Sequence, residues 1–365
     1  IFAIKGALER SGWAPEDIDY VIMGQVLLAG AGQNPARQAA WAGGIDMTTP
    51  ALTVNKVCLS GLNAIALADQ GIRAGEFRAV VAGGMESMSR APHLLRESRS
   101  GIKFGSWPLE DSLTRDGLSC TFDGCSMGEA TEQYNERYEI SRIDQDSLAA
   151  SSHQRAAAAQ AAGYFDEEIV SVSSEGRSKA PVLVSVDEGV RSATTVESLA
   201  RLNPAFHPKG TITAGNASQI SDGAAALVVV SPAIADEHAV KPLASLGAHG
   251  AVAGPDASLH EQPAAAIEVA CAKEGISVSD IDLFEINEAF AAVSLVSTRR
   301  LGVDPMKVNV NGGAIALGHP VGMSGARLVL HLVHELRRRG GGVGAAALCG
   351  GGGQGDAILV RVPGP

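Results

Sequence analysis

The sequence contains two copies of one pattern, and this repeat constrains the fold more than any other feature. Residues 4–24 align without gaps on residues 267–287 at a constant offset of 263. The matching positions are Ile4 with Ile267, Gly12 with Gly275, Asp17 with Asp280, Ile18 with Ile281 and Asp19 with Asp282. Each copy predicts an amphipathic helix that stops at its glycine, then a short turn and a buried strand.

A second correspondence follows each copy at an offset of 264. Ser60-Gly61 opens an apolar helix over residues 62–74, and a strand over 79–82 follows. Ser324-Gly325 likewise opens a helix over 326–339, followed by a strand over 343–348 and four successive glycines at 350–353. Helices that alternate with strands predict an α/β fold, made of two duplicated halves that each hold a mostly parallel sheet under layers of helices.

A region of different character separates the copies. Residues from about 89 to 216 are rich in Arg, Ser, Asp and Glu, and the pattern predicts a helix over 142–162. We interpret this region as an insertion that packs on one half. Linker-like sequence at 231–242 then predicts an N-terminal domain at 1–232, which contains the insertion, and a C-terminal domain at 239–365.

The charge and the cysteines exclude several classes of protein. The formal net charge is −11, and the longest basic run is the triplet at 337–339, so we expect no binding to nucleic acid or anionic membrane. No stretch approaches the roughly 20 apolar residues of a membrane helix. Five scattered cysteines fit neither a disulfide framework nor a zinc ribbon, which favours a reducing cytoplasm.

Cys58 is a candidate nucleophile. It lies where the β-branched run around Val54 and Val57 meets the helix that Ser60 opens. A helix N-terminus favours the thiolate, which predicts a lowered thiol pKa. The alternative is an inert buried cysteine. Cys349 lies at the end of the matching strand, before the glycine run whose backbone N–H groups could line an oxyanion hole.

His319 is the best candidate for a general base. It stands between Gly318 and Pro320, directly before the second copy's helix at Ser324, so it is displayed on a loop. The chain has 43 glycines, and many gather around these loops, where we expect them to bring backbone donors close to a ligand.

Asn287 and Glu288 follow the predicted strand over 283–286. Polar residues at the carboxyl end of a parallel strand are typical of α/β sites, although Asn287 could equally be an ordinary helix cap. The small residues at 213–218 could cradle a ligand or form a turn. The sequence has neither a Walker loop nor a dinucleotide-binding glycine motif in a suitable βα unit.

Together these segments resemble the thiolase family, in particular its acetyl-CoA acetyltransferase group. The resemblance runs over essentially the whole chain and rests on four motifs in the same order. They are Asn55-Lys56-Val57-Cys58-Leu59-Ser60-Gly61, Asn287-Glu288-Ala289-Phe290, the stretch 312–327 around Gly318-His319-Pro320, and Cys349-Gly350-Gly351-Gly352.

The resemblance implies a role for each candidate. His319 would deprotonate Cys58, whose thiolate takes the acyl group from one acyl-CoA. Cys349 would remove a proton from the α-carbon of a second acetyl group, or return one in thiolysis. Asn287, through a water, and His319 would form one oxyanion hole, and the backbone N–H groups of Cys58 and Gly351 would form the other.

The resemblance also implies that the inserted region holds coenzyme A, which is a substrate and not a tightly bound cofactor. It further implies a homotetramer built as a dimer of dimers and no metal. The positions that match the family's coenzyme A and acyl contacts are Arg191, Ser198, Phe206, Ala214, Ser218, Leu118, Met127, Ala289 and Phe290.

The sequence departs from the family pattern at three places. It starts at the helix that follows the family's first strand, so we expect that strand of the first sheet to be absent. Ser126 stands where biosynthetic members have His and degradative members have Pro, and residues 259–263 replace a Met-Gly-x-Gly-Pro loop. Besides an acetyl-CoA C-acetyltransferase, two alternatives therefore stay open: a 3-ketoacyl-CoA thiolase of broader chain length in fatty-acid β-oxidation, and a non-catalytic CoA-binding scaffold.

Overall fold

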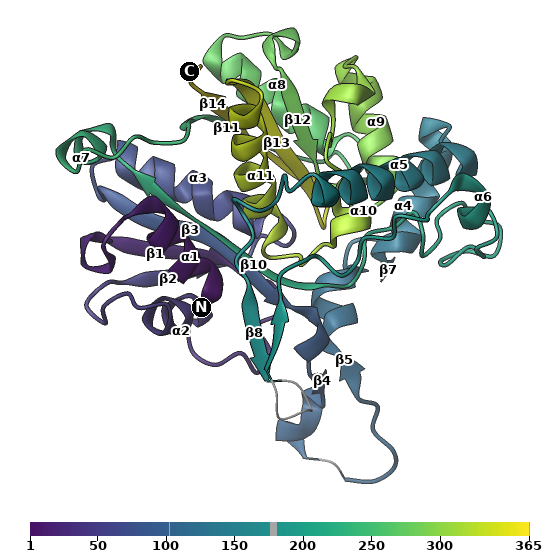
Figure 1. The fold of residues 1–365 in the computed structure, drawn as a ribbon. Coiled ribbons are helices and arrows are strands. Elements are labelled where there is room, and N and C mark those ends of the chain that lie inside the picture. The colour runs from purple at the N-terminus through teal and green to yellow at the C-terminus, as the bar shows by residue number, and fades with distance from the viewer. Residues whose placement is uncertain (102, 176–180, 365) are drawn as a thin grey trace.

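The computed structural model describes residues 1–101, 103–175 and 181–364, and it contains two similar α/β halves (Figure 1). The first half consists of α1 (Phe2–Ser11), β1 (Tyr20–Gly24), α2 (Pro35–Ala42), β2 (Ala51–Val54), α3 (Ser60–Arg73), β3 (Ala79–Ser87), β10 (Asp222–Val230) and α7 (Pro232–Glu237). The second half consists of β11 (Ser245–Ala253), α8 (Gln262–Glu274), β12 (Leu283–Ile286), α9 (Ala291–Leu301), α10 (Ala314–Leu317), α11 (Ser324–Arg338), β13 (Gly342–Gly350) and β14 (Gln354–Val362).

The first sheet is mostly parallel, as predicted. Its strand order is β10-β3-β1-β2, in which β1 runs parallel to both β2 and β3. Only β10, which returns after the insertion, pairs antiparallel to β3.

The second sheet differs from the prediction. Its order is β11-β14-β13-β12, and only β12 and β13 are parallel, whereas β14 is antiparallel to both its neighbours. The prediction of a mostly parallel sheet is therefore wrong for this half. Residues 351–353 alone join β13 to β14, and a parallel pair would need a crossover of a dozen residues or more.

Alternation along the strands produces a layered core. In β1, Ile22 faces one hydrophobic cluster while Val21 and Met23 face another, because successive strand residues point to opposite sides. Helices α3 and α11 pack against each other between the two sheets and fill the shared cluster (Figure 1). Helices α1 and α2 cover the outer face of the first sheet, and α8 covers the outer face of the second.

The repeat seen in the sequence is realised closely. Gly12 and Gly275 end α1 and α8 in the left-handed region, with φ of 67° and 68°. A one-turn 3₁₀ helix follows each, at Pro15–Asp17 and Val278–Asp280, and a buried strand comes next. Glycine suits both stops because it adopts positive φ without a steric penalty.

Glycine also permits the close contact between the halves at the start of α3. A Cβ atom at Gly61 would lie 2.8 Å from the Met323 carbonyl oxygen, directly before α11. A Cβ atom at Gly325 of α11 would likewise lie too close to Leu62 of α3. The N-termini of α3 and α11 are therefore in direct contact.

The inserted region extends from the first half and contains one long helix. Its elements are β4 (His93–Leu94), β5 (Glu110–Asp111), β6 (Ser119–Cys120), β7 (Cys125–Ser126), α4 (Met127–Asn135), α5 (Arg142–Ala161), β8 (Val172–Glu175), β9 (Pro181–Val184) and α6 (Val196–Leu199). The β4–β5 hairpin projects away from the sheets (Figure 1). Residues 102 and 176–180 of the predicted insertion, and residue 365 of the predicted second domain, lie outside the described residues.

The stretch predicted as a linker contains α7. Its Ile234 and Ala235 are buried, and Ile234 belongs to the cluster under the first sheet. Within the described part of the chain, none of the helices combines the length and the apolar character needed to cross a bilayer.

Candidate active site

The candidate residues lie on five loops or strand ends around the N-termini of α3 and α11. Cys58 lies directly before α3, and His319 lies between α10 and α11. Asn287 follows β12, Cys349 is the penultimate residue of β13, and Gly351 begins the turn to β14. The carboxyl ends of β12 and β13 meet at one sheet edge because these strands are parallel.

Cys58 sits on a tight, strained loop. Val57 has φ of 50°, a left-handed conformation that is unusual for a β-branched residue and costs on the order of 1–3 kcal/mol. The Asn55 side-chain oxygen accepts from the Val57 N–H at 3.0 Å, and the Ser60 hydroxyl accepts from the Lys56 N–H at 2.8 Å. These contacts hold the thiol in a fixed place, as a nucleophile requires.

The electrostatics of Cys58 differ from the prediction. Burial raises the pKa of its thiol to about 11, although the backbone N–H groups of Cys58 and Gly351 act to lower it. The nearby Glu86 carboxylate raises it further. The predicted lowering of the pKa by the helix N-terminus is therefore wrong, because desolvation outweighs it. The thiol accordingly needs a base to ionise it.

His319 is held as a neutral base. Burial, assisted by the charge of Arg327, lowers the pKa of His319 to about 4. Its Nδ1 lies 2.6 Å from the Ser324 hydroxyl oxygen, which itself donates to the Pro320 carbonyl. The hydroxyl must therefore accept from Nδ1–H, and this assigns the unprotonated lone pair to Nε2.

Asn287 lies beside that lone pair and does not cap a helix. Its Nδ2 is 3.3 Å from His319 Nε2, and the residue is fully buried. Its Oδ1 is buried without a hydrogen-bond partner among the described residues. Phe290, not Asn287, is the N-cap of α9, so the alternative of a simple capping role is wrong. An unpaired buried amide oxygen beside a base is a place where a polar ligand can bind.

Cys349 lies in a buried hydrophobic cluster near Cys58. It is only 1% exposed, and burial raises the pKa of its thiol, with a further contribution from Cys58. The cluster around it contains four residues that the resemblance assigned to coenzyme A or acyl contacts: Met127, Phe206, Ala289 and Phe290. The Phe206 and Phe290 rings meet edge to face at 6.2 Å.

The remaining predicted contacts are more dispersed. Leu118 packs with Cys58 against the cluster of Val26, Leu27, Met88 and Val321. The Ser218 N–H donates to the Ala289 carbonyl at 3.0 Å, which places Ser218 next to the hydrophobic cluster that contains Cys349. Arg191, Ser198 and Ala214 are exposed, and the side-chain hydrogen bonds of Ser198 stay within its own turn with Thr195.

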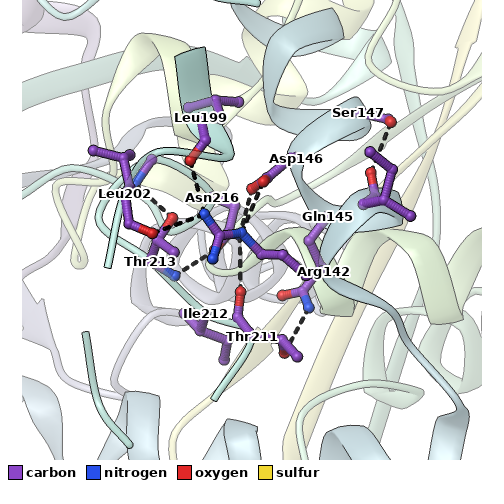
Figure 2. Close-up of polar contacts among 12 residues, drawn as sticks. Arg142, Gln145, Asp146, Ser147, Leu199, Leu202, Thr211, Ile212, Thr213 and Asn216 are labelled. Atoms are coloured by element: carbon purple, nitrogen blue, oxygen red, sulfur yellow. Dashed lines mark hydrogen bonds and ion pairs between the residues drawn. The ribbon is translucent and has the colours of Figure 1, made fainter. Parts of the chain in front are cut away.

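A polar network anchors the loop that carries Ala214 and Ser218. Figure 2 shows Asn216 at its centre, where its Nδ2 donates to Asp146 at 2.9 Å and to the Thr211 carbonyl at 3.1 Å. Arg142 binds the same Asp146 at 2.7 Å and also donates to the Leu199 carbonyl at 2.7 Å, directly after Ser198. Helix α5 thus fixes two of the segments predicted to contact coenzyme A.

Two buried carboxylates hold the site together, and sequence reasoning singled out Glu288 but missed Glu86. Glu86 accepts the backbone N–H groups of Val26, Leu27 and Gly322 at 2.9, 3.2 and 3.1 Å, which ties the His319 loop to the first sheet. A glutamate at the end of an otherwise apolar strand was the available signal.

Glu288 has a similar task in the second half. It accepts from Ser152 at 2.7 Å, from Asn309 at 2.9 Å and from the Ile315 N–H at 3.1 Å. Burial raises the pKa of Glu86 and of Glu288, while the hydrogen bonds to each oppose that shift.

A cavity of about 450 Å³ opens beside the loop that carries Cys58. Its lining includes Asn55, Val57, Met127, Phe122 and Gly351. Among the described residues, no group of three or more His, Cys, Asp or Glu side chains is arranged to hold a metal ion. The arrangement offers a thiol, a neutral imidazole, a second thiol and converging N–H donors, which suits acyl transfer.

Family comparisons agree with this chemistry. Residues 1–233 match the model of the thiolase N-terminal domain, and residues 240–362 match that of the thiolase C-terminal domain. The chain belongs to the thiolase family.

Named relatives and a solved structure cover nearly all of this thiolase. It is 59% identical to the "Probable acetyl-CoA acetyltransferase" of Mycolicibacterium smegmatis, covering 98% of this chain and 92% of that protein. It is 49% identical to the acetyl-CoA acetyltransferase of Cupriavidus necator, covering 98% and 91%. The crystal structure of human mitochondrial 3-ketoacyl-CoA thiolase matches with a TM-score of 0.95 at 41% identity, covering 99% of this chain and 91% of that one.

Proposed function

We propose that this thiolase is an acetyl-CoA C-acetyltransferase. It condenses two acetyl-CoA molecules to acetoacetyl-CoA and CoA, and it catalyses the reverse thiolysis, through an acetyl group carried on Cys58. The observation that carries the proposal is the surroundings of the Cys58 sulfur, where the N–H groups of Cys58 and Gly351 converge on one partly buried thiol. The names of relatives at 46–59% identity support the same assignment.

The first half-reaction uses the neutral state of His319. Nε2 takes the Cys58 proton, and the thiolate attacks the acetyl-CoA carbonyl. The oxyanion forms between the N–H groups of Cys58 and Gly351, which are fixed before the reaction starts. The C–S bond to coenzyme A then breaks, and the departing thiolate receives the proton held by His319.

The second half-reaction uses the other thiol. Neutral His319 first takes the proton of Cys349, and the resulting thiolate removes a proton from the methyl carbon of a second acetyl-CoA. The enolate oxygen lies at His319 and at a water held by Asn287, whose buried Oδ1 is available to accept from it. The enolate carbon attacks the acetyl-Cys58 carbonyl, the C–S bond breaks, and the departing Cys58 thiolate recovers its proton from His319.

The inserted region at about 89–216, within a domain at 1–232, supplies the coenzyme A site in this proposal, and 239–365 forms the second domain. The hydrophobic cluster of Met127, Phe206, Ala289 and Phe290, of which Met127 also lines the 450 Å³ cavity, would provide an apolar surface for the pantetheine arm and the acyl group. Ser218 is bonded to Ala289 of this cluster, Leu118 packs beside Cys58 in a neighbouring cluster, and Arg191, Ser198 and Ala214 offer exposed contacts to the nucleotide end. Arg191 would meet phosphate.

We further propose a cytoplasmic homotetramer. Nucleophilic thiols require a reducing compartment, which supports the location. The segment between β4 and β5 exposes Phe104 and Leu109, and large exposed apolar residues favour contact with another subunit. Light scattering after gel filtration measures the assembly directly.

A 3-ketoacyl-CoA thiolase of broader chain length is a second candidate, because the 450 Å³ cavity beside Val57 and Gly351 is much larger than an acetyl group. Comparing kcat/KM for acetoacetyl-CoA with that for a longer 3-ketoacyl-CoA separates the two. Equal or higher efficiency on the longer substrate would favour the second candidate.

The central test is acetyl-CoA incubation followed by peptide mass spectrometry. We expect an acetyl adduct on Cys58 and acetoacetyl-CoA thiolysis in the same preparation. Bound coenzyme A without adduct or turnover would instead indicate a non-catalytic scaffold.

A further inference from the structure

A partly buried ion pair joins the two halves beside the loop that carries Cys58. Lys56 Nζ lies 2.7 and 2.9 Å from the two carboxylate oxygens of Asp356. The Asp356 side chain is fully buried, and that of Lys56 is 26% exposed. Asn63 Nδ2 lies 3.4 Å and His249 Nε2 lies 3.6 Å from the same carboxylate.

Lys56 is hydrogen-bonded within the loop that carries Cys58. Lys56 precedes Cys58 by two residues and is separated from it only by Val57, whose φ of 50° has to be imposed by its surroundings. The Lys56 carbonyl accepts from the Leu59 N–H at 3.2 Å, and its N–H donates to Ser60 at 2.8 Å. A shift of Lys56 would therefore shift Cys58.

Asp356 lies on the strand that pairs with the strand of Cys349. Asp356 lies on β14 directly opposite Leu348, and the next pair in the register is Cys349 with Gly355. The backbone of Asp356 is thus one residue pair away from that of Cys349, so a shift of β14 at Asp356 would be passed on to Cys349. Strand β14 belongs to the second half, whereas the Cys58 loop belongs to the first.

We infer that Lys56 and Asp356 are positioning residues that set the separation between Cys58 and Cys349. The inference rests on the proposed function, because only a reaction that uses both thiols makes their spacing matter. Acylation of Cys58 requires that thiol and His319 but not Cys349. Condensation requires the α-carbon activated at Cys349 to reach the acetyl carbon on Cys58.

This division of labour distinguishes positioning from general stability. A merely structural pair would weaken both half-reactions in the same proportion. A positioning pair affects the step that spans the two halves, and a displacement of about 1 Å can cost roughly 100-fold in rate.

The experiment measures both half-reactions in the full-length protein. Rapid quench with acetyl-CoA gives the rate of Cys58 acetylation, and a coupled assay gives kcat for condensation. The variants are Lys56→Met, Lys56→Arg and the double variant Lys56→Met with Asp356→Asn. The double variant removes both charges and leaves no unpaired buried carboxylate, which protects the fold.

Arg338→Met serves as the matched control. Arg338 also binds a buried carboxylate, that of Glu335 at 2.7 Å, but at the far end of α11 from His319. Thermal unfolding of every variant shows that the folded protein is being assayed.

We expect condensation to fall by about 100-fold in Lys56→Met and in the double variant, while acetylation falls far less. Lys56→Arg should recover part of the loss, and Arg338→Met should change neither rate. Equal losses in both steps, or undiminished condensation in the folded double variant, would overturn the inference. Absence of acetylation and turnover in the unmodified protein would instead overturn the proposed function.

Discussion

The two halves of this thiolase share one scaffold but carry different chemistry at matching places. The loop before α3 holds Cys58, and the loop before α11 holds His319. Strand β3 ends with the carboxylate Glu86, whereas β13 ends with the thiol Cys349. A duplicated fold thus gives two equivalent edges, and small local changes place Cys58 in one half and His319 and Cys349 in the other.

The same comparison explains the asymmetry after the first strand of each repeat. Asn287 after β12 corresponds to Gly24 at the end of β1. A Cβ atom at Gly24 would lie 2.6 Å from the Gly322 carbonyl and from the Gly61 N–H. The first half cannot hold a side chain there, because the loop before α11 occupies the space.

Removing each thiol in turn gives the largest expected effect. Cys58→Ala should lower kcat for thiolysis by about 10⁴-fold or more, because the acyl group loses its covalent carrier. Cys349→Ala should keep Cys58 acetylation and lose condensation by about 10²–10⁴-fold. Cys271→Ala, on the outer helix α8, is the control and should remain active. Rapid-quench and steady-state assays measure both steps, and a Cys349→Ala protein that condenses normally would contradict the division between halves.

Asn287→Ala should have the next largest effect. Loss of one oxyanion-stabilising group costs about 10²–10³-fold in kcat. We expect kcat to fall with little change in KM, since the buried amide contacts His319 and not the exposed coenzyme A segments. Steady-state kinetics decide this, and a change confined to KM would place Asn287 in substrate binding.

Acid should destabilise the second half through two of its buried histidines, His260 and His319. Burial lowers the pKa of His260 and of His319 to about 4, whereas the unfolded chain binds these protons near pH 6.5. The unfolded state therefore holds more protons between pH 6.5 and pH 4, and the free energy of unfolding should fall across that window as the pH drops. Each histidine contributes at most about 3 kcal/mol. Urea unfolding at several pH values tests this, and His260→Asn should flatten the slope.

The smallest expected effect tests how closely the halves repeat each other. Gly12→Ala and Gly275→Ala place a Cβ on a left-handed helix stop with no heavy atom within 4 Å. Each should cost about 1 kcal/mol of unfolding free energy, from backbone strain alone. Denaturant titration gives both values. If the losses of unfolding free energy in the two variants differ by much more than 1 kcal/mol, the two helix stops contribute unequally to stability.

Much of the site could be predicted from the sequence because its signals are local. The glycine stops, the strand over 283–286 and the helices opened by Ser60 and Ser324 depend on neighbouring residues, and the structure confirms them. The motifs around Cys58 and His319 led to the thiolase family, which the domain matches confirm. The roles of the individual site residues stay predictions.

Other features depend on contacts between distant segments. Strand β11 joins the edge of β14 from about 100 residues away and runs antiparallel to it, and the sequence pattern of a buried strand is the same for either direction. Helix α7 in the expected linker forms because Ile234 packs into the hydrophobic cluster under the first sheet. Neither outcome can be predicted from the local sequence.

The sequence by itself determined the duplicated α/β scaffold and the family, and it supplied the residues proposed to carry the chemistry, because these depend on periodicity and on short motifs. Only the tertiary structure decided their electrostatics and spacing. The pKa of Cys58 is raised rather than lowered because folding removes water from the thiol, and desolvation depends on every segment that covers it. Lys56 and Asp356 are 300 residues apart, so only the packed molecule could bring them together.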